Sequence, residues 1–319
     1  MKSPNAAVGT RTDEAKRTSK RSHRWFLGPE ALSFLACPAC QGSLEPSFPL
    51  SAAGFAEGEL KCRGCSRPWP VRDGVPELVY PDELNAQDLQ SRRLWNRIAS
   101  FYDRIGALTN VMRGIAGTRE RSNLVQRLEL QPGQCVLEVA AGSGGNIRVI
   151  ADQMSDRVTV FGLDLSTRML GRAIRNLREV RPRPTLVLGN SNRLPFADDA
   201  FDAVLDGFGM KYYSDKGGAV REMLRVVKAG GKVVITELGL PPDKRRNFRQ
   251  RLLLLWIPHF GQGPPLGEIP GDVIDRKVEW DRHETAYVVE FRKPTRPQQI
   301  QGILPSEALL GEGGVQWSR

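Results

Sequence analysis

Two acidic side chains flank a run of small residues in a pattern that could hold a nucleoside. Glu138 lies near the end of an apolar run at 136–139, Asp164 ends a second apolar run at 159–164, and small residues fill 140–145. Small residues let a ligand approach main-chain amides, and a carboxylate at a strand end can accept hydrogen bonds from both ribose hydroxyls. A glycine-rich turn alone would indicate only a tight turn, but together with Asp164 it predicts binding of a nucleotide-like cofactor.

Four of the five cysteines form two Cys-x-x-Cys pairs, Cys37 with Cys40 and Cys62 with Cys65. Zinc takes four thiolates in a tetrahedron, and two such pairs on facing hairpins supply them. Because protein ligands fill all four positions, we expect a structural Zn²⁺ that replaces a core too small to hold the segment together. The pattern also leaves open bound iron or an empty site. Cys135, the fifth cysteine, is expected to be an inert buried thiol.

The elements that must position these residues alternate along the chain. Apolar runs predict strands at 136–139, 159–164, 185–188, 203–205 and 232–237, and amphipathic patterns predict helices at 92–105, 118–130, 166–180 and 217–227. The runs 273–280 and 285–291 predict a final hairpin. Such alternation is typical of an α/β fold, and we expect a doubly wound, mostly parallel seven-stranded sheet with helices on both faces.

Composition divides the chain into five predicted parts. Residues 1–30 are polar and basic and are predicted to be a disordered tail, and the cysteine pairs define a small zinc-ribbon domain at 31–80. A polar, acidic linker is expected at 81–94, a cofactor-binding domain at 95–295 and a flexible tail at 296–319.

The net charge permits an anionic partner without demonstrating one. The 319 residues carry a formal charge of +10, which suits nucleic acid or an acidic membrane surface. No apolar run approaches the roughly 18 residues that a membrane-spanning helix needs, and no apolar stretch typical of a secretory signal precedes Trp25. We therefore expect a cytoplasmic protein.

The segment after the second cysteine pair resembles a known zinc-ribbon family. The run from Arg67 to Val79, Arg-Pro-Trp-Pro-Val-Arg-Asp-Gly-Val-Pro-Glu-Leu-Val, looks like the end of the small ribbons that serve as activator subunits of RNA and release-factor methyltransferases. The resemblance covers about residues 31–80. It implies that the ribbon binds and stabilises a methyltransferase, and here one would follow in the same chain.

The alternating segment resembles the class I S-adenosylmethionine-dependent methyltransferases, and within them the group that includes the ubiquinone and menaquinone biosynthesis C-methyltransferases. The matching runs lie at 136–144, 162–166, 189–196, 201–202, 207–212 and 221–231, and the segment 251–261 looks like the part after the fifth strand in the quinone enzymes. The likeness covers about residues 95–261 and implies a Rossmann-like fold with S-adenosylmethionine as cofactor.

The resemblance assigns roles to residues of this chain. It implies main-chain contacts from Ala140, Gly142 and Gly144 and an ordering role for Glu138. Asp164 would accept hydrogen bonds from the ribose, Leu165 and Met169 would pack on the adenine, and Asn190 and Ser191 would contact its edge. Tyr102 and Asp206 would contact the methionine end. Three of these depart from the usual pattern. Ala140 replaces a glycine, Asn190 an acid and Asp206 a small polar residue.

The expected reaction is an in-line displacement that moves a methyl group to carbon or oxygen of a small apolar or aromatic acceptor. The acceptor should lie beside Asp206, Phe208, Met210 and Tyr212. If a proton must leave, Asp206 and His259 are the candidate bases. Two alternatives remain open: a methyltransferase of RNA or protein that uses the ribbon to grip its substrate, and a binding protein without catalysis.

A basic stretch, 244–251, precedes an apolar stretch, 252–257. It indicates either a helix that covers the active site or peripheral contact with an anionic membrane. A small-molecule acceptor is the favoured partner, nucleic acid is less favoured, and the oligomeric state is open.

Overall fold

The computed structural model describes residues 25–49, 51–113, 117–242, 245–248, 250, 251, 254 and 263–295. The predicted basic tail up to residue 24, the tail at 296–319, most of the stretch 243–262 and His259 lie outside these residues.

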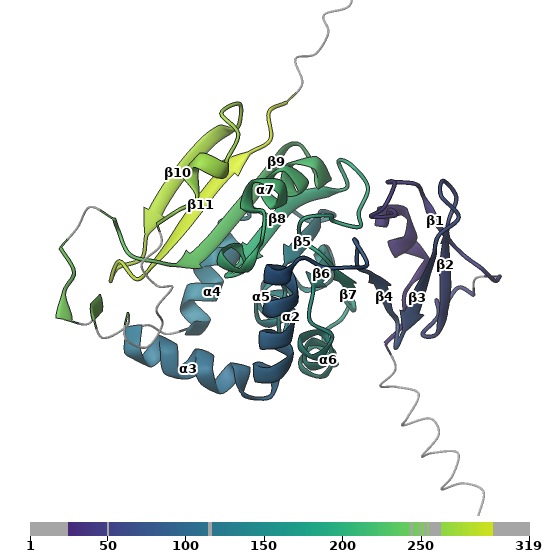
Figure 1. The fold of residues 1–319 in the computed structure, drawn as a ribbon, viewed down its shortest axis with the longest axis horizontal. Helices are drawn as coiled ribbons and strands as arrows, with labels where there is room; N and C mark the ends of the chain where they lie inside the picture. The colour runs from purple at the N-terminus through teal and green to yellow at the C-terminus, as the bar shows by residue number, and fades with distance from the viewer. Residues whose placement is uncertain are drawn as a thin grey trace, which may run out of the picture.

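The core of the fold is a mostly parallel sheet in the order β7-β6-β5-β8-β9-β11-β10 (Figure 1). Its strands are β5 (Cys135–Val139), β6 (Thr159–Asp164), β7 (Thr185–Gly189), β8 (Phe201–Gly207), β9 (Val227–Leu238), β10 (Ile274–Trp280) and β11 (Ala286–Arg292). The first five run parallel, and β11 and β10 add as an antiparallel hairpin beyond β9. The seven predicted strands and the mixed α/β fold are confirmed.

Helices cover both faces of this sheet because successive strand residues point to opposite sides. Leu137 and Val139 pack on one side with α7 (Lys216–Val226), whereas Val136 packs on the other with α4 (Gly117–Gln126), α5 (Gly145–Met154) and α6 (Thr167–Asn176). Two further helices, α2 (Ala86–Ile98) and α3 (Tyr102–Arg113), lie at the carboxyl ends of the strands, where they close a cavity. None of the helices within the described ranges has both the length and the apolar character needed to cross a membrane.

The ribbon continues the sheet instead of standing apart from it. It consists of the 3-10 turn η1 (Pro29–Phe34), β1 (Leu44–Pro46), β2 (Gly58–Cys62), β3 (Pro68–Arg72) and β4 (Val75–Leu78). Strand β4 pairs in parallel with β7, Glu77 opposite Leu188 and Leu78 opposite Gly189, so the whole sheet has eleven strands (Figure 1). No pattern in the sequence predicted this pairing.

Aromatic packing reinforces this junction. The ring of Phe34, from η1, lies 4.7 Å from the ring of Phe161 and 5.7 Å from that of Phe201. The main chain is joined as well, because Ala197 N donates to Phe34 O at 2.9 Å. The ribbon and the main sheet therefore share one hydrophobic core.

The ordered chain extends past the boundaries expected from composition. Trp25 and Leu27, placed in the predicted tail of residues 1–30, are buried, and Leu27 exchanges two hydrogen bonds with Phe55. Helix α2 begins at Ala86, inside the predicted linker, with the side chain of Asn85 as its N-cap. Neither the burial of this N-terminal segment nor the start of α2 was predicted, because both segments are mostly polar and pack through only a few apolar side chains.

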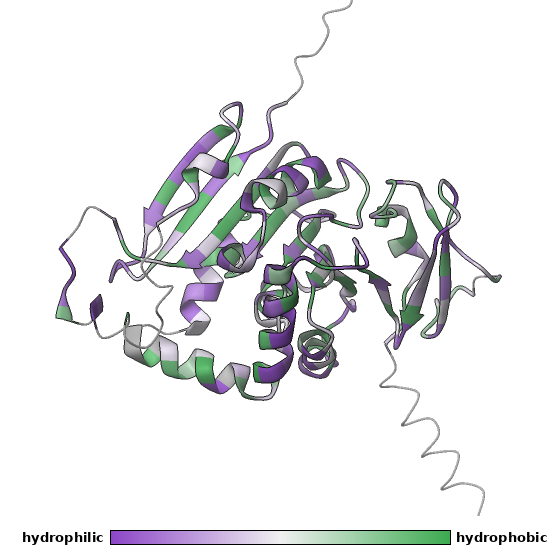
Figure 2. Ribbon diagram, viewed as in Figure 1, coloured by the Kyte–Doolittle hydropathy of each residue, from purple (hydrophilic) through white to green (hydrophobic). Residues whose placement is uncertain are grey.

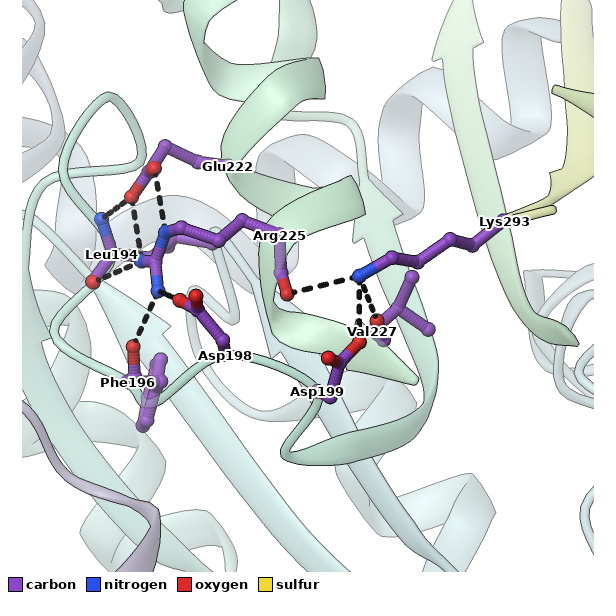
Figure 3. A network of polar contacts seen from close by, with 8 residues as sticks. All are labelled: Leu194, Phe196, Asp198, Asp199, Glu222, Arg225, Val227 and Lys293. Carbon is purple, nitrogen blue, oxygen red and sulfur yellow. Dashed lines mark hydrogen bonds and ion pairs between the residues drawn. The ribbon is translucent and has the colours of Figure 1, made fainter. Parts of the chain in front are cut away.

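An arginine on α7 holds the loop that leads from β7 to β8 (Figure 3). The guanidinium of Arg225 donates to Glu222, to Asp198 and to the carbonyl oxygens of Leu194 and Phe196, all at 2.8 Å. Because the same loop contacts the ribbon through Phe34 and begins next to the predicted cofactor residues, Arg225 links the two regions.

We expect Arg225→Met to lower the free energy of unfolding by about 2–4 kcal/mol, because Glu222 and two buried carbonyl groups lose their donor. Urea unfolding would measure the change. Arg221→Met is the matched control: Arg221 lies on the same helix with its side chain 66% exposed, and its loss should cost less than about 0.5 kcal/mol. Equal losses for the two variants would contradict the proposed role of the network.

Candidate functional site

A cavity of about 310 Å³ opens where the carboxyl ends of β5, β6, β7 and β8 meet α2 and α3. This is the edge at which parallel α/β sheets bind ligands, and the volume suits a small cofactor. Its wall includes eight residues predicted from the sequence to contact the cofactor: Tyr102, Ala140, Gly142, Asp164, Leu165, Met169, Asn190 and Ser191.

The turn after β5 brings main-chain amides to the cavity. Ala140 and Gly142 have positive φ angles of 55° and 56°, which turn the chain sharply back toward the sheet. A Cβ added to Gly142 would lie 3.3 Å from Met169 Cε, so the absence of a side chain keeps a narrow space open between the turn and Met169. Gly144 departs from its predicted role. It does not line the cavity. It is the N-cap of α5, and a Cβ there would lie 2.7 Å from the side chain of Leu177, at the end of α6.

Asp164 faces the turn, as its predicted role requires. One carboxylate oxygen accepts a hydrogen bond from Gly142 N at 2.8 Å and the other accepts from Ser166 N at 2.8 Å. Burial raises the pKa of Asp164 to about 6, although these amide hydrogen bonds act in the opposite direction. The side chain lies on the cavity wall and can accept further hydrogen bonds from a ligand diol.

Glu138 lies behind the wall and acts through other residues. It is buried, and Asn146 Nδ2 donates to its Oε1 at 2.6 Å. Arg121 in turn donates to Asn146 Oδ1 at 2.6 Å and does line the cavity. Burial raises the pKa of Glu138 to about 8. Glu138 therefore holds Asn146, the residue after the glycine turn, and Arg121 places a positive charge on the cavity wall.

Asp206 does not face the cavity. It is fully buried, its Oδ1 accepts from Gly209 N at 2.9 Å, and its Oδ2 accepts from the hydroxyl of Tyr213. Burial raises its pKa to about 7. Because Gly209 and Tyr213 line the cavity, the structure makes Asp206 a support for the wall, not the predicted base or ligand contact. The other candidate base, His259, lies outside the described residues.

Sequence reasoning missed a charged pair at the far end of the cavity. Lys211 Nζ lies 2.9 Å from Glu237 Oε1, and the two side chains are only 8% and 2% exposed. Burial acts to lower the pKa of Lys211, but the charge of Glu237 outweighs it and the pKa is raised. Lys211 lines the cavity as an ammonium ion. The pair joins the turn after β8 to the end of β9, so no local spacing could have indicated it.

Aromatic rings form the wall beside this lysine. The ring of Trp95 stands edge-to-face with Tyr102 at 5.6 Å and with Tyr212 at 5.0 Å, measured between centroids. Lys211 Nζ lies 5.2 Å from the centre of the Tyr212 ring. Burial raises the pKa of Tyr102 above its ordinary value, so its hydroxyl stays neutral. This end of the cavity combines flat apolar surfaces with the ammonium group of Lys211.

A second cavity, of about 510 Å³, lies between α4 and the hairpin β10–β11. It shares Arg121 and Phe208 with the first cavity. Phe208 has a φ angle of 71°, a conformation that is costly for a side chain of its size and is characteristic of functional turns. Phe208 therefore stands between the cofactor cavity and a space large enough for another molecule.

The four paired cysteines converge in the ribbon. Their Sγ atoms lie within 4.8 Å of one another, with Cys37 to Cys65 at 3.7 Å and Cys40 to Cys62 at 3.4 Å. A tetrahedron with Zn–S bonds of about 2.3 Å places sulfur atoms roughly 3.8 Å apart, so the set fits zinc. A Cβ on Gly42 would come within 2.8 Å of Cys62 Sγ, which explains the glycine. The closed set of four thiolates makes this a structural zinc site.

The sheet order, the glycine turn and the carboxylate of Asp164 on the cavity wall are together typical of the class of S-adenosylmethionine-dependent methyltransferases. The chain matches the ubiE/COQ5 methyltransferase family over residues 83–258, more than half of its length, and it belongs to that family. Residues 29–74 match the Trm112p-like protein family.

Curated relatives agree with this assignment. The demethylmenaquinone methyltransferase of Thermotoga maritima is 34% identical over 174 residues, which cover 53% of this chain and 71% of that protein. That of Renibacterium salmoninarum is 37% identical, over 50% of this chain and 61% of the relative. The ubiquinone/menaquinone biosynthesis C-methyltransferase UbiE of Legionella pneumophila is 31% identical, over 50% and 63%. The chain thus spans less than two thirds of the length of the last two relatives.

Proposed function

We propose that this protein transfers the methyl group of S-adenosylmethionine to a ring carbon or phenolic oxygen of a small, apolar aromatic acceptor related to a quinol. The observation that carries the proposal is one cavity with two unlike ends. At one end Asp164 and the turn at Gly142 suit a nucleoside, and at the other Lys211 stands among aromatic rings. The names of the relatives, demethylmenaquinone and ubiquinone methyltransferases, support a quinol-like acceptor.

S-adenosylmethionine supplies a methyl group on a positively charged sulfur, so the chain need not activate it. What the residues must do is orient and desolvate the partners. Asp164 and the amides after β5 would hold the nucleoside, and Met169 and Leu165 would pack against its base. Tyr102 lies near Gly142, with its hydroxyl 3.9 Å from the position of a Cβ there, and its ring can stabilise a nearby cation.

The acceptor end favours a phenolate. A phenol that has given its proton to solvent directs electron density onto the neighbouring ring carbons, which makes them nucleophiles. The carbon that takes the methyl group then releases its own proton to solvent, and the sulfur leaves as neutral S-adenosylhomocysteine. The buried ammonium of Lys211 can accommodate the phenolate oxygen, since in a site closed to water an opposite charge is worth much more than in solution. Glu237 fixes the lysine in place, because its Oε1 also accepts from Leu238 N at 2.8 Å. Tyr212 and Phe208 would lie against the ring of the acceptor.

We expect Lys211→Met to reduce turnover by roughly 10²-fold while the affinity for S-adenosylhomocysteine changes less than about threefold. The assay would follow an isotopic label from the methyl group into reduced demethylmenaquinone with a short prenyl chain. Lys211→Arg keeps the charge and should retain much of the activity. Cofactor binding by the wild type without label transfer to this acceptor, or to simpler phenols, would refute the proposed acceptor class.

We also propose that the protein meets its apolar acceptor at a membrane surface. Phe101 and, on α3, Ile105, Leu108 and Val111 recur at helical spacing and are all exposed, Val111 at 74%. Figure 2 shows hydrophobic segments along α3. Ile105 also lines the cavity, so this face adjoins its entrance. Flotation with anionic vesicles tests the idea: Leu108→Glu combined with Val111→Glu should abolish co-flotation, and unchanged flotation would refute it.

A further inference from the structure

Helix α2 places a buried carboxylate at the end of the cavity where the nucleobase would lie. Asp88, in the first turn of α2, is only 4% exposed and lines the cavity beside Asn190 and Ser191. Asn190 Nδ2 donates to Asp88 Oδ2 at 3.2 Å. Among the residues that line this cavity, the acids are Asp88 and Asp164, and Asp164 belongs to the glycine turn.

Counting hydrogen bonds shows what Asp88 can still accept. An ionised carboxylate offers about four acceptor positions. Three are used: Oδ2 accepts from Asn85 Nδ2 at 2.8 Å and from Asn190 Nδ2, and Oδ1 accepts from Ser214 N at a long 3.3 Å. Asn190 is meanwhile fixed at both ends, because its Oδ1 accepts from Asn192 N at 3.0 Å. Asp88 therefore retains acceptor capacity at the cavity wall, where a base edge would lie.

We infer that Asp88 accepts a hydrogen bond from the 6-amino group of adenine and so selects an adenine nucleoside over a 6-oxo purine. The inference rests on the proposed use of S-adenosylmethionine. A carboxylate can only accept, so it suits the amino group of adenine and repels the carbonyl oxygen of hypoxanthine. Asn190 acts as the positioning residue, since it holds Asp88 by a hydrogen bond and is itself held by the main chain.

The position of Asp88 links base recognition to the ribbon. Asp88 follows ribbon strand β4 by only a short connection, and β4 pairs with β7, the strand that ends just before Asn190. Two more contacts fix the start of α2 on the turn that follows β8: Gln87 Nε2 donates to Tyr213 O at 2.9 Å, and Ser91 Oγ donates to Tyr212 O at 3.2 Å. The base would thus lie between a sheet strand and the segment that immediately follows the ribbon.

Calorimetry with the full-length protein tests the inference with S-adenosylhomocysteine and S-inosylhomocysteine, which carry a 6-amino and a 6-oxo purine. The wild type should prefer the adenine ligand by about 10- to 100-fold. Asp88→Asn places an amide donor at this position and should bring the preference close to 1 or reverse it. Asp152→Asn, on the exposed surface of α5, should leave the preference unchanged.

A second variant separates recognition from folding. Asp88→Asn combined with Asn190→Asp exchanges carboxylate and amide but keeps the pair, so it should fold and recover most of the adenine preference. If Asp88→Asn weakens both ligands equally, or if the double variant folds without recovering the preference, Asp88 is only structural and the inference fails. Failure of the wild type to bind either ligand would instead overturn the proposed cofactor, and the inference with it.

Discussion

Asp164→Asn is expected to weaken binding of S-adenosylhomocysteine by roughly 10²- to 10³-fold, because hydrogen bonds from the ribose to a charged acceptor are each worth about 1.5–3 kcal/mol. The asparagine also cannot accept from both Gly142 N and Ser166 N, so the turn loses part of its support. Calorimetric titration would measure the loss. Asp152→Asn, with a 63% exposed carboxylate on α5, is the control and should bind as the wild type does.

The pH dependence of binding distinguishes a direct role of the Asp164 carboxylate in ligand binding from a general loss of the fold. Since burial raises the pKa of Asp164 to about 6, the wild type should lose affinity about tenfold per pH unit below that value, whereas Asp164→Asn should not respond there. The raised pKa also means that the ionised carboxylate costs stability: the cost grows between pH 3.8, the ordinary pKa, and about 6, and it is constant above that. At pH 8 the ligand-free variant avoids this cost but gives up one of the two main-chain hydrogen bonds, so it should melt close to the wild-type temperature. A variant that melts lower and yet binds normally would contradict this account.

Loss of the zinc site should have the largest effect on stability. Structural zinc contributes roughly 10–16 kcal/mol of apparent binding free energy to small domains, and its four ligands join the two turns at 37–40 and 62–65. We expect Cys62→Ser to abolish stoichiometric zinc binding and to unfold the ribbon. Because Phe34 packs on Phe161 and Phe201, the catalytic domain should melt at a lower temperature too. Elemental analysis and scanning calorimetry would measure both effects.

Cys135→Ser provides the control for this experiment. Cys135 lies at the start of β5, outside the cluster of four thiols, so its replacement should leave the zinc content at one per chain. A Cys62→Ser protein that retains zinc and the wild-type melting profile would contradict a structural role of the metal. Normal melting of the catalytic domain after loss of zinc would instead show that the ribbon adds no stability to its neighbour.

The features that could be predicted from the sequence are those set by local patterns. Strand β6 and the position of Asp164 follow from an apolar run that ends in an acid, and the turn at Gly142 follows from a run of small residues. The zinc ligands follow from two short spacings. Each of these patterns lies within a few residues of the chain, so steric and chemical rules are sufficient to predict the structure it forms.

The features that escaped prediction depend on contacts between distant segments. Lys211 is a surface-type residue by composition, and only its pairing with Glu237 makes burial tolerable. Asp88 looked like part of a polar linker until α2 brought it to Asn190. The reverse error occurred at Asp206 and Gly144, whose positions near the motif suggested ligand contact although one supports Tyr213 and the other packs against Leu177.

The pairing of β4 with β7 has a consequence for what else can bind this enzyme. The outer edge of a sheet is the place where foreign strands add, through the main-chain groups left unpaired there. In this chain a tethered segment already occupies the edge at β7, at an effective concentration that a free competitor could hardly match. A separate ribbon protein would therefore be excluded from β7, and each catalytic domain would be paired with the one ribbon of its own chain.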